Sequence, residues 1–176
     1  PVATKLSGGI DSKLVAHYAR RHRKDAPGYF LGSETAPDFR YVSDYADKSG
    51  IDLRIVPFAP DSAQTFSRIG EVVAASETFE PVAIRGAICS YVLSEAMHRD
   101  GFRVSLCGEG ADELFAGYVP LEWAYAASED AGRSARDQCL AQMHSTVLQR
   151  LDRCSMRFAL ETREPFLDPR VAAYAL

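Results

Sequence analysis

The sequence predicts an α/β fold, a parallel sheet with helices on both faces. Four short apolar segments have the length and composition of buried strands, namely residues 2–6, 28–31, 53–58 and 104–107. Helical patterns separate them, and strands that alternate with helices favour a parallel sheet covered on both sides. The chain has 176 residues, 47% of them apolar, which is enough for one domain with a sizeable core. We expect a single domain over residues 1–176, with an α/β core to about residue 118 and a helical part from about 119 to 176.

The first predicted strand runs into a turn, Ser-Gly-Gly-Ile-Asp-Ser at residues 7–12, and then into a helix. Gly8 and Gly9 let the backbone bend tightly, while exposed amides, the helix dipole and the hydroxyls of Ser7 and Ser12 converge on one small anion. A phosphate or pyrophosphate is the expected occupant. The pattern G-x-x-x-x-G-K-[ST] of the commoner phosphate loop is absent. An ordinary tight turn before a capped helix is the alternative interpretation.

Apolar spacing predicts where the helices lie. The helix after the turn should bury one face, and a second helix, around residues 84–98, should bury another. These faces consist of Leu14, Val15, Tyr18 and Ala19, and of Ile84, Ile88, Tyr91, Val92 and Ala96. Strand signals stop after about residue 118, and residues 135–150 repeat apolar side chains at Leu140, Met143, Val147 and Leu151. The last third is therefore predicted to be mostly helical.

A second glycine- and acid-rich segment, CGEGADELFAGY at residues 107–118, follows the strand at 104–107. Ligands of open parallel sheets bind beyond the carboxyl ends of the strands, so both loops should face one crevice. Gly108 and Gly110 allow close approach to a ligand. Glu109, Asp112 and Glu113, with Asp11 of the first turn, predict an oxygen-ligated magnesium ion that bridges carboxylates to phosphate oxygens. Alternatively, Asp112 and Glu113 simply occupy the first turn of a helix, where the dipole favours acids.

Composition excludes several classes of protein. The net charge of −4 and the single short basic run at residues 20–24 argue against a general nucleic-acid surface. No apolar stretch approaches the roughly 18 residues of a membrane span. Cys89, Cys107, Cys139 and Cys154 form no C-x-x-C pair, so neither a zinc site nor a disulfide framework is indicated. We expect reduced core thiols in a cytoplasmic protein.

Three blocks of sequence resemble a known family. Residues 7–12 resemble the pyrophosphate loop (PP-loop) of the N-type ATP pyrophosphatases, and residues 108–118 resemble the synthetase domain of asparagine synthetases. Residues 151–168, ending in Glu-Thr-Arg-Glu-Pro-Phe-Leu-Asp, are similar to a third motif of that family. The resemblance implies an adenine nucleotide α-hydrolase-like fold that cleaves ATP between the α and β phosphates. It also implies a carboxylate activated as an acyl adenylate, and an amine that attacks it to release AMP and an amide.

The resemblance also implies roles for particular residues. Ser7, Gly8, Gly9 and Ser12 would hold the pyrophosphate, Asp11 and Asp112 would bind Mg²⁺, and Leu6, Leu31, Cys107 and Gly108 would line the nucleotide pocket, with Leu31 near adenine. Glu109 would lie near the adenylate and position or deprotonate the amine, unless it is a structural loop acid. Arg85 matches an arginine near the acceptor substrate, with a surface arginine as the alternative. For Arg163, pairing with its acidic neighbours is favoured over contact with an anionic ligand.

The chain also departs from the family pattern. Val82 and Ala83 stand where threonines are usual, so an acceptor other than aspartate, as in β-lactam- or macrolactam-forming relatives, is the runner-up. A non-catalytic nucleotide-binding module is the alternative from another class. The family's glutaminase domain and its lysine-bearing C-terminal continuation have no counterpart in residues 1–176. We therefore expect a piece of a longer polypeptide or a chain that works with a glutaminase partner, and a homodimer is a further candidate assembly.

Overall fold

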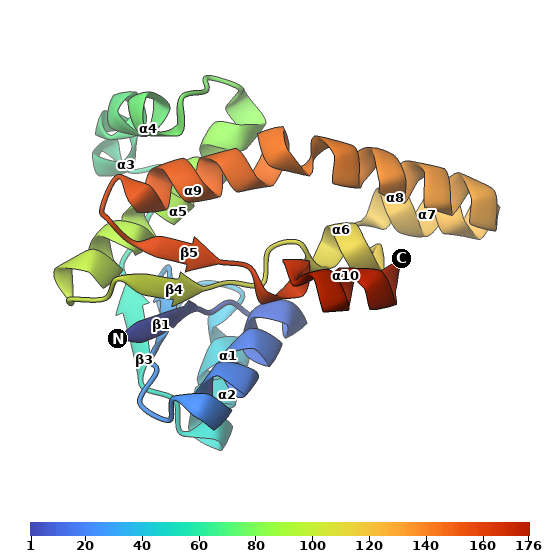
Figure 1. The fold of residues 1–176 in the computed structure, drawn as a ribbon. Coiled ribbons are helices and arrows are strands. Elements are labelled where there is room, and N and C mark those ends of the chain that lie inside the picture. The colour runs from blue at the N-terminus through green and yellow to red at the C-terminus, as the bar shows by residue number, and fades with distance from the viewer.

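The computed structural model describes all residues from 1 to 176, and its centre is a sheet of five parallel strands in the order β3-β2-β1-β4-β5 (Figure 1). The strands are β1 (Val2–Lys5), β2 (Gly28–Leu31), β3 (Leu53–Val56), β4 (Val104–Leu106) and β5 (Glu161–Arg163). All four predicted strands are present. The predicted α/β class with a parallel sheet is therefore confirmed.

The register of the sheet places the loops that follow β1 and β4 side by side. Strand β1 pairs with β2 through Thr4 and Gly28, and with β4 through Ala3 and Ser105. Because every pairing is parallel, the carboxyl ends of all strands meet at one edge. The two glycine-rich loops thus leave adjacent central strands at the same edge, as the sequence predicts.

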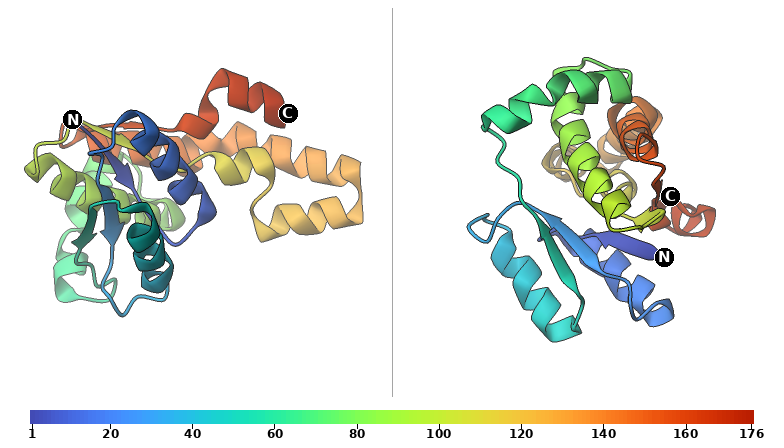
Figure 2. Two further views of the ribbon diagram at one scale, coloured as in Figure 1. Left: turned by 90° about the horizontal axis from the view of Figure 1, so that it is seen from below. Right: turned by 90° about the vertical axis from the view of Figure 1, so that its left-hand side faces the viewer.

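Helices cover both faces of the sheet (Figure 2). One face carries α1 (Ile10–His22) and α2 (Phe39–Ser49), and the other carries α5 (Pro81–Arg99), α4 (Ile69–Ser76) and α9 (Gln149–Met156). The helices α7 (Val119–Ala127) and α8 (Glu129–Met143) pack together as a hairpin that projects from the sheet (Figure 1). The remaining helices are α3 (Ala63–Ser67), α6 (Ala111–Phe115), the π-helix η1 (His144–Leu148), the 3-10 helix η2 (Pro165–Leu167) and α10 (Pro169–Ala175). No helix is long and apolar enough to cross a membrane.

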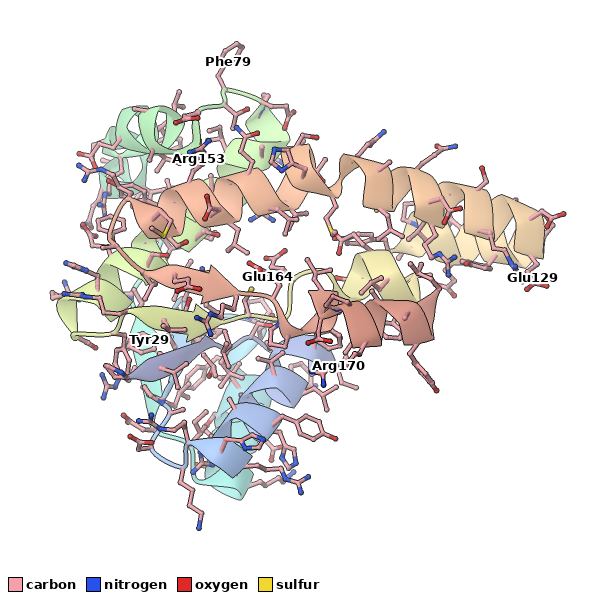
Figure 3. All side chains as sticks on the ribbon, in the orientation of Figure 1. Tyr29, Phe79, Glu129, Arg153, Glu164 and Arg170 are labelled. Atoms are coloured by element: carbon pink, nitrogen blue, oxygen red, sulfur yellow. The ribbon has the colours of Figure 1, made fainter.

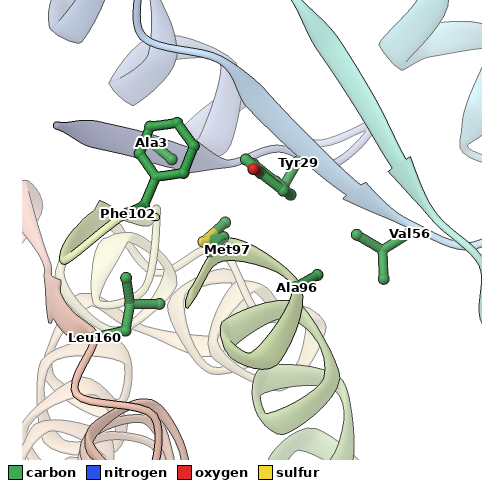
Figure 4. Close-up of a cluster of buried hydrophobic side chains, with 7 residues drawn as sticks. All are labelled: Ala3, Tyr29, Val56, Ala96, Met97, Phe102 and Leu160. Atoms are coloured by element: carbon green, nitrogen blue, oxygen red, sulfur yellow. The ribbon is translucent and has the colours of Figure 1, made fainter. Parts of the chain in front are cut away.

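The alternation of side chains along the strands builds two hydrophobic layers. Tyr29 of β2 packs with Met97 of α5 on one face, in the cluster drawn in Figure 4. The next residue, Phe30, packs on the other face, where α1 and α2 contribute Ala16 and Val42. Both faces of the central strands are therefore closed to water, and ligands reach these strands only at their ends.

One strand was missed by the sequence analysis. Strand β5 lies in the last third, predicted to be mostly helical, and it extends the sheet beyond residues 1–118 by pairing with β4. Its residues Glu161, Thr162 and Arg163 are polar and show no buried alternation. The strand forms because it supplies an edge partner to β4, where the hydroxyls of Ser105 and Thr162 lie 2.8 Å apart.

The predicted apolar face of α1 also differs from the observed one. Ser12, Val15 and Ala16 are buried, whereas Leu14 and Tyr18 are 42% and 53% exposed. The face of α1 that packs on the sheet therefore begins at Ser12 and continues at positions i+3 and i+4. This face is selected because Ser12 must point toward the turn that it stabilises. The buried face of α5 agrees better with prediction, since Ile88, Tyr91 and Ala96 all point inward.

The helix predicted at residues 135–150 is part of a longer, interrupted one. It begins in α8, passes through the π-helix η1 and continues as α9. Val147 and Leu151 of the predicted apolar stripe are buried. A π-turn changes the phase of the helix that follows it and often occurs at functional sites, and here it precedes Arg150, which enters the cleft described next.

Candidate active site

A cleft of about 610 Å³ opens at the carboxyl edge of β1, β2 and β4. The turn after β1, the loop after β4, the end of β2 and one face of α5 form its walls. The predicted site residues that line it are Leu6, Ser7, Gly9, Asp11, Ser12, Leu31, Cys107, Gly108, Glu109 and Asp112. The fold thus brings together residues that lie a hundred positions apart in the sequence.

The turn at residues 7–12 is held in shape by its two serines. The Ser7 amide donates a hydrogen bond to Ser12 Oγ (3.0 Å), and the two hydroxyl oxygens lie 2.9 Å apart. The Gly9 amide donates to Ser7 Oγ at 3.2 Å. Helix α1 begins directly after Gly9, without a side-chain cap. The amides of its first turn therefore remain free for an anion, as the predicted phosphate site at residues 7–12 requires.

Gly108 brings the second loop against the first. A Cβ atom at this position would lie 2.9 Å from the Ser12 amide nitrogen and 3.0 Å from the carbonyl carbon of Asp11. These are backbone atoms of the first turn of α1, which cannot swing aside. Only glycine allows the two loops to approach this closely, which explains one of the glycines singled out in the sequence.

Asp11 and Asp112, one from each loop, both line the cleft near this contact. Burial, followed by the negative charges of Asp11, Glu113 and Glu109, raises the pKa of Asp112. Asp112 accepts no side-chain hydrogen bond, and no set of three acidic, cysteine or histidine side chains is close enough to hold a metal alone. This donor set fits Mg²⁺ of the kind that takes one or two carboxylates and completes its shell with water and ligand phosphates.

Glu113 has a different role from Asp112. Both acids occupy the first turn of α6, as the helix-dipole alternative expected. Glu113 is 2% exposed, and its Oε1 accepts a 2.7 Å hydrogen bond from the hydroxyl of Tyr118. Burial, followed by the hydrogen bond to Glu113 and the nearby negative charges, raises the pKa of that tyrosine. The pair ties the second loop to the chain that continues into α7.

Glu109 pairs with an arginine that sequence reasoning missed. Arg150 Nη2 lies 3.6 Å from Glu109 Oε2, and Arg150 Nε donates to the Thr146 carbonyl of the π-helix. The guanidinium also lies against Gly86 of α5, where a Cβ atom would be 2.7 Å from Arg150 Cζ. The π-turn and a glycine on the facing helix thus make room for one arginine beside the candidate catalytic acid.

Leu31, the last residue of β2, lines the cleft, and its contact with adenine stays a prediction. Phe30, Ala36 and Pro37 line the same end and give it an apolar character. Gly8 does not line the cleft, because its missing side chain faces Asp38, whose Cγ would lie 3.0 Å from a Cβ atom. Asp38 itself lines the cleft and was not anticipated.

Arg85 does not line the cleft, which is a departure from its predicted place. The residues of α5 that do so are Gly86, Cys89, Ser90 and Leu93, spaced as one helical stripe. Arg85 lies about a quarter-turn from that stripe and is exposed. Val82 is 73% exposed and Ala83 is buried in the first turn of α5, so neither lines the cleft. Arg163 pairs with Glu161 at 2.8 Å, as favoured above.

Lys5 is a further cleft residue that the sequence motifs do not predict. It ends β1, lines the cleft and is only 9% exposed, and its amine has no hydrogen-bond partner. A lysine beside a turn suggests a surface residue. Only its place at the end of a central strand, covered on both faces, indicates burial.

All four cysteines are free thiols. Cys107 and Cys154 are buried, and burial raises their pKa values to about 12 and about 11. Cys89 and Cys139 are partly exposed, so the prediction of core thiols holds for two of the four. The Cys107 thiol lies 3.8 Å from the Arg163 carbonyl and helps to seat the second loop on β5.

A five-stranded parallel sheet with a Ser-Gly-Gly-x-Asp-Ser turn after its central strand defines an α/β protein of the PP-loop, adenine nucleotide α-hydrolase-like class. A solved structure from Methanocaldococcus jannaschii, titled "predicted subunit of tRNA methyltransferase", has a similar fold. Its TM-score is 0.50 at 13% sequence identity, over 98% of this chain and 73% of that one.

The sequence comparisons define the family. The family model described as asparagine synthase matches residues 1–142 and 126–176, and the chain belongs to this family. It is 32% identical over 173 residues to an M. jannaschii protein whose name includes "asparagine synthetase [glutamine-hydrolyzing] 1". It is 30% identical over 178 aligned residues to the human asparagine synthetase (glutamine-hydrolyzing). Each alignment covers 97% of this chain and 31% of the relative, so the chain spans about a third of the relatives' length.

Proposed function

We propose that this chain is the ATP-binding part of an enzyme that forms an amide through an acyl adenylate, most simply that of asparagine synthesis. One observation carries the proposal: the anion cradle at residues 7–12 and the acidic loop at 108–113 share one cleft, held together at Gly108. Family membership supports ATP-dependent amide formation.

In this proposal different groups of the chain bind the phosphates, the Mg²⁺ ion and the adenine. The free amides of the first turn of α1, with Ser7 and Ser12, bind the phosphates that leave as pyrophosphate. Asp11 and Asp112 would hold Mg²⁺, which supplies charge neutralisation for the leaving phosphates when it is bound. The apolar end around Leu31 receives adenine.

Glu109 would orient the amine and accept its proton, because a carboxylate within hydrogen-bond reach can act as a general base. Arg150 pairs with that carboxylate, its Nη2 lying 3.6 Å from Glu109 Oε2, and so holds it in the cleft. Arg85, which is exposed and does not line the cleft, remains a predicted contact of the acceptor carboxylate. The amine is ammonia, or it comes from a glutaminase domain or partner chain. Four free thiols fit a reducing compartment such as the cytoplasm.

The test is to incubate the purified chain with ATP, Mg²⁺, aspartate and ammonium, and to quantify AMP, pyrophosphate and asparagine. The Asp11→Asn variant should lose all three products. Asp47→Asn, the same change at an exposed position of α2, is the matched control and should keep them. AMP without asparagine would indicate another carboxylate acceptor. ATP binding without AMP would contradict the catalytic proposal and favour a non-catalytic module.

A further inference from the structure

Lys5 combines a buried charge with the absence of a hydrogen-bond partner. Its side chain is 9% exposed, and its Nζ atom is inaccessible to solvent and unpaired. Burial lowers the pKa of the amine, and electrostatic interactions with Cys107, Glu109, Glu164 and Cys154 act in the opposite direction. These groups come from three separate elements: the loop after β4, the segment after β5, and α9.

The strand geometry indicates which part of the cleft Lys5 faces. Lys5 has the same strand parity as Ala3, which packs with α5 in the cluster of Figure 4. Its side chain is therefore on the α5 and α9 face of the sheet, opposite to α1. Glu164 lies just past the end of β5 on this face, below α9 (Figure 3). The amine thus faces the half of the cleft that also holds Glu109 and Arg150.

A purely structural role does not explain this lysine. Burying an ammonium group is costly unless hydrogen bonds and an opposite charge compensate for it. The chain does build compensated pairs elsewhere, as in the two hydrogen bonds of 2.7 and 2.9 Å from Arg68 to Glu95. Lys5 lacks such a partner although two carboxylates influence its pKa. An unpaired donor that lines a cleft is completed by a ligand.

We infer that Lys5 Nζ is a binding contact for an oxyanion of the ligand in the half of the cleft beside Glu109. The inference rests on the proposed function, which supplies two such groups, the α-phosphate of the nucleotide and the carboxylate of the acceptor. Both would lie at this point, because the acyl adenylate joins them. Nothing in the sequence motifs assigns this role to Lys5.

The surrounding charges predict how this contact forms. Glu109 and Glu164 already place negative charge beside the amine, and burial raises the pKa of Glu164. A further anion favours the ammonium form of Lys5, so binding should be accompanied by proton uptake. Other groups near the amine could also change their protonation on binding, and a Lys5 variant separates their proton uptake from that of Lys5. These groups are Glu109, Glu164, Cys107, Cys154 and Arg150.

The experiment is isothermal titration of the full chain with Mg²⁺ and α,β-methylene-ATP, which cannot be cleaved at the α–β bond. Wild type, Lys5→Met, Lys5→Arg and Lys48→Met are compared in two buffers that differ in ionisation enthalpy. Lys48 is an exposed lysine of α2 that pairs with Asp44, so its variant is the matched control. If Lys5 contacts the α-phosphate, wild type and Lys48→Met should take up more protons on binding than Lys5→Met.

If Lys5 contacts the α-phosphate, Lys5→Met should weaken analogue binding about 10- to 100-fold, as expected for a charge-assisted hydrogen bond. Lys5→Arg should recover part of the loss. If Lys5 contacts the carboxylate instead, analogue binding stays unchanged, and the aspartate KM of AMP formation rises by a similar factor. The melting temperature of Lys5→Met should not fall, because methionine fills the space without a buried charge.

Equal analogue affinity and equal aspartate dependence in wild type and Lys5→Met would overturn the inference and leave the proposed function standing. A wild type that binds no analogue would refute the proposed function, and this inference with it. If Lys5→Met does not fold, the ¹⁵Nζ shift of Lys5 in labelled wild type decides the matter. Its titration must move to higher pH when the analogue or aspartate binds, and no movement overturns the inference.

Discussion

Replacing Gly108 by alanine tests the contact that joins the two halves of the candidate site. The new Cβ atom would lie 2.9 Å from the Ser12 amide nitrogen and 3.0 Å from two atoms of Asp11. Ordinary carbon contacts lie at about 3.5–4.0 Å, so the second loop must retreat by about 0.5–1 Å. Two of these atoms belong to the backbone of α1 and the third is Asp11 Cβ, so no side-chain rotation relieves the overlap.

The cost can be stated in both stability and binding. Overpacking of this kind costs about 1–3 kcal/mol, and the loss of a flexible glycine from the unfolded chain returns about 0.4–1 kcal/mol. The net cost is therefore about 0–2.6 kcal/mol, and for a chain of this size the melting temperature should fall by up to about 10 °C. A shift of about 1 Å in the positioning groups also predicts a large loss of nucleotide affinity, up to about 100-fold.

Differential scanning calorimetry and titration with the nucleotide analogue measure the two effects. Gly70→Ala in α4 is the matched control, since a Cβ atom there would meet nothing within 4 Å. It should raise the melting temperature slightly and leave binding unchanged. The reasoning is refuted if Gly108→Ala behaves like Gly70→Ala in both measurements, since the contact with α1 would then have no structural consequence.

Three further predictions concern other parts of the molecule. Gly86→Ala should displace the Arg150 guanidinium, which is the movable end of a side chain. The free energy of unfolding in urea should therefore stay within about 1 kcal/mol of wild type, while AMP formation falls. Unchanged AMP formation would exclude a role for the pairing of Arg150 with Glu109. Asp112→Asn should unfold at the same or a higher temperature without Mg²⁺, because burial and neighbouring acids raise the pKa of Asp112 and make its charge costly. It should also lose the Mg²⁺-ATP-dependent rise in melting temperature, and a rise equal to that of wild type would contradict Asp112 as a ligand. Hydrogen bonds, first from Tyr29 and then from Arg54, lower the pKa of Asp100 in the folded protein. The ionised carboxylate therefore contributes its full stabilisation above the unfolded-state pKa of about 4. That stabilisation is lost as the pH falls through the lower pKa of the folded state. Denaturation of Asp100→Asn between pH 2 and 6 should therefore show a smaller acid-side loss than wild type, and identical profiles would be the contrary result.

The sequence predicted features whose cause is local. Gly8, Gly9 and Gly108 stand out because only glycine permits a tight turn or a close backbone approach, and Ser7 and Ser12 bond within the same turn. The four predicted strands lie in mostly apolar segments, although Lys5, Arg54 and Ser105 interrupt the pattern. The class of fold and the meeting of the two loops followed from these signals together with the rule that parallel strands share one carboxyl edge.

The missed features depend on contacts between distant segments. Strand β5 is polar and exists because β4 has a free edge. Arg150 enters the cleft because a π-turn sets the phase of α9 and because Gly86 leaves space on the facing helix. Arg85 has the same side chain, and a sequence motif predicts it near the acceptor, yet its position on α5 leaves it exposed. No local pattern distinguishes these two arginines.

The two faces of β1 suggest how the family could change its acceptor without changing its use of ATP. The turn after β1 and the helix that follows it belong to the α1 side, where the sequence motifs concentrate and where phosphate binding is proposed. Lys5, Arg150 and Glu164 belong to the α5 and α9 side, and none of them is part of the anion cradle. Both sets line one cleft, but neither Lys5 nor Arg150 bonds to Ser7 or Ser12, so a substitution at either should leave the serine hydrogen bonds of the turn intact. In the proposed function, exchanging residues on the α5 and α9 side should alter the acceptor if Lys5 contacts the carboxylate, and should weaken nucleotide binding instead if Lys5 contacts the α-phosphate.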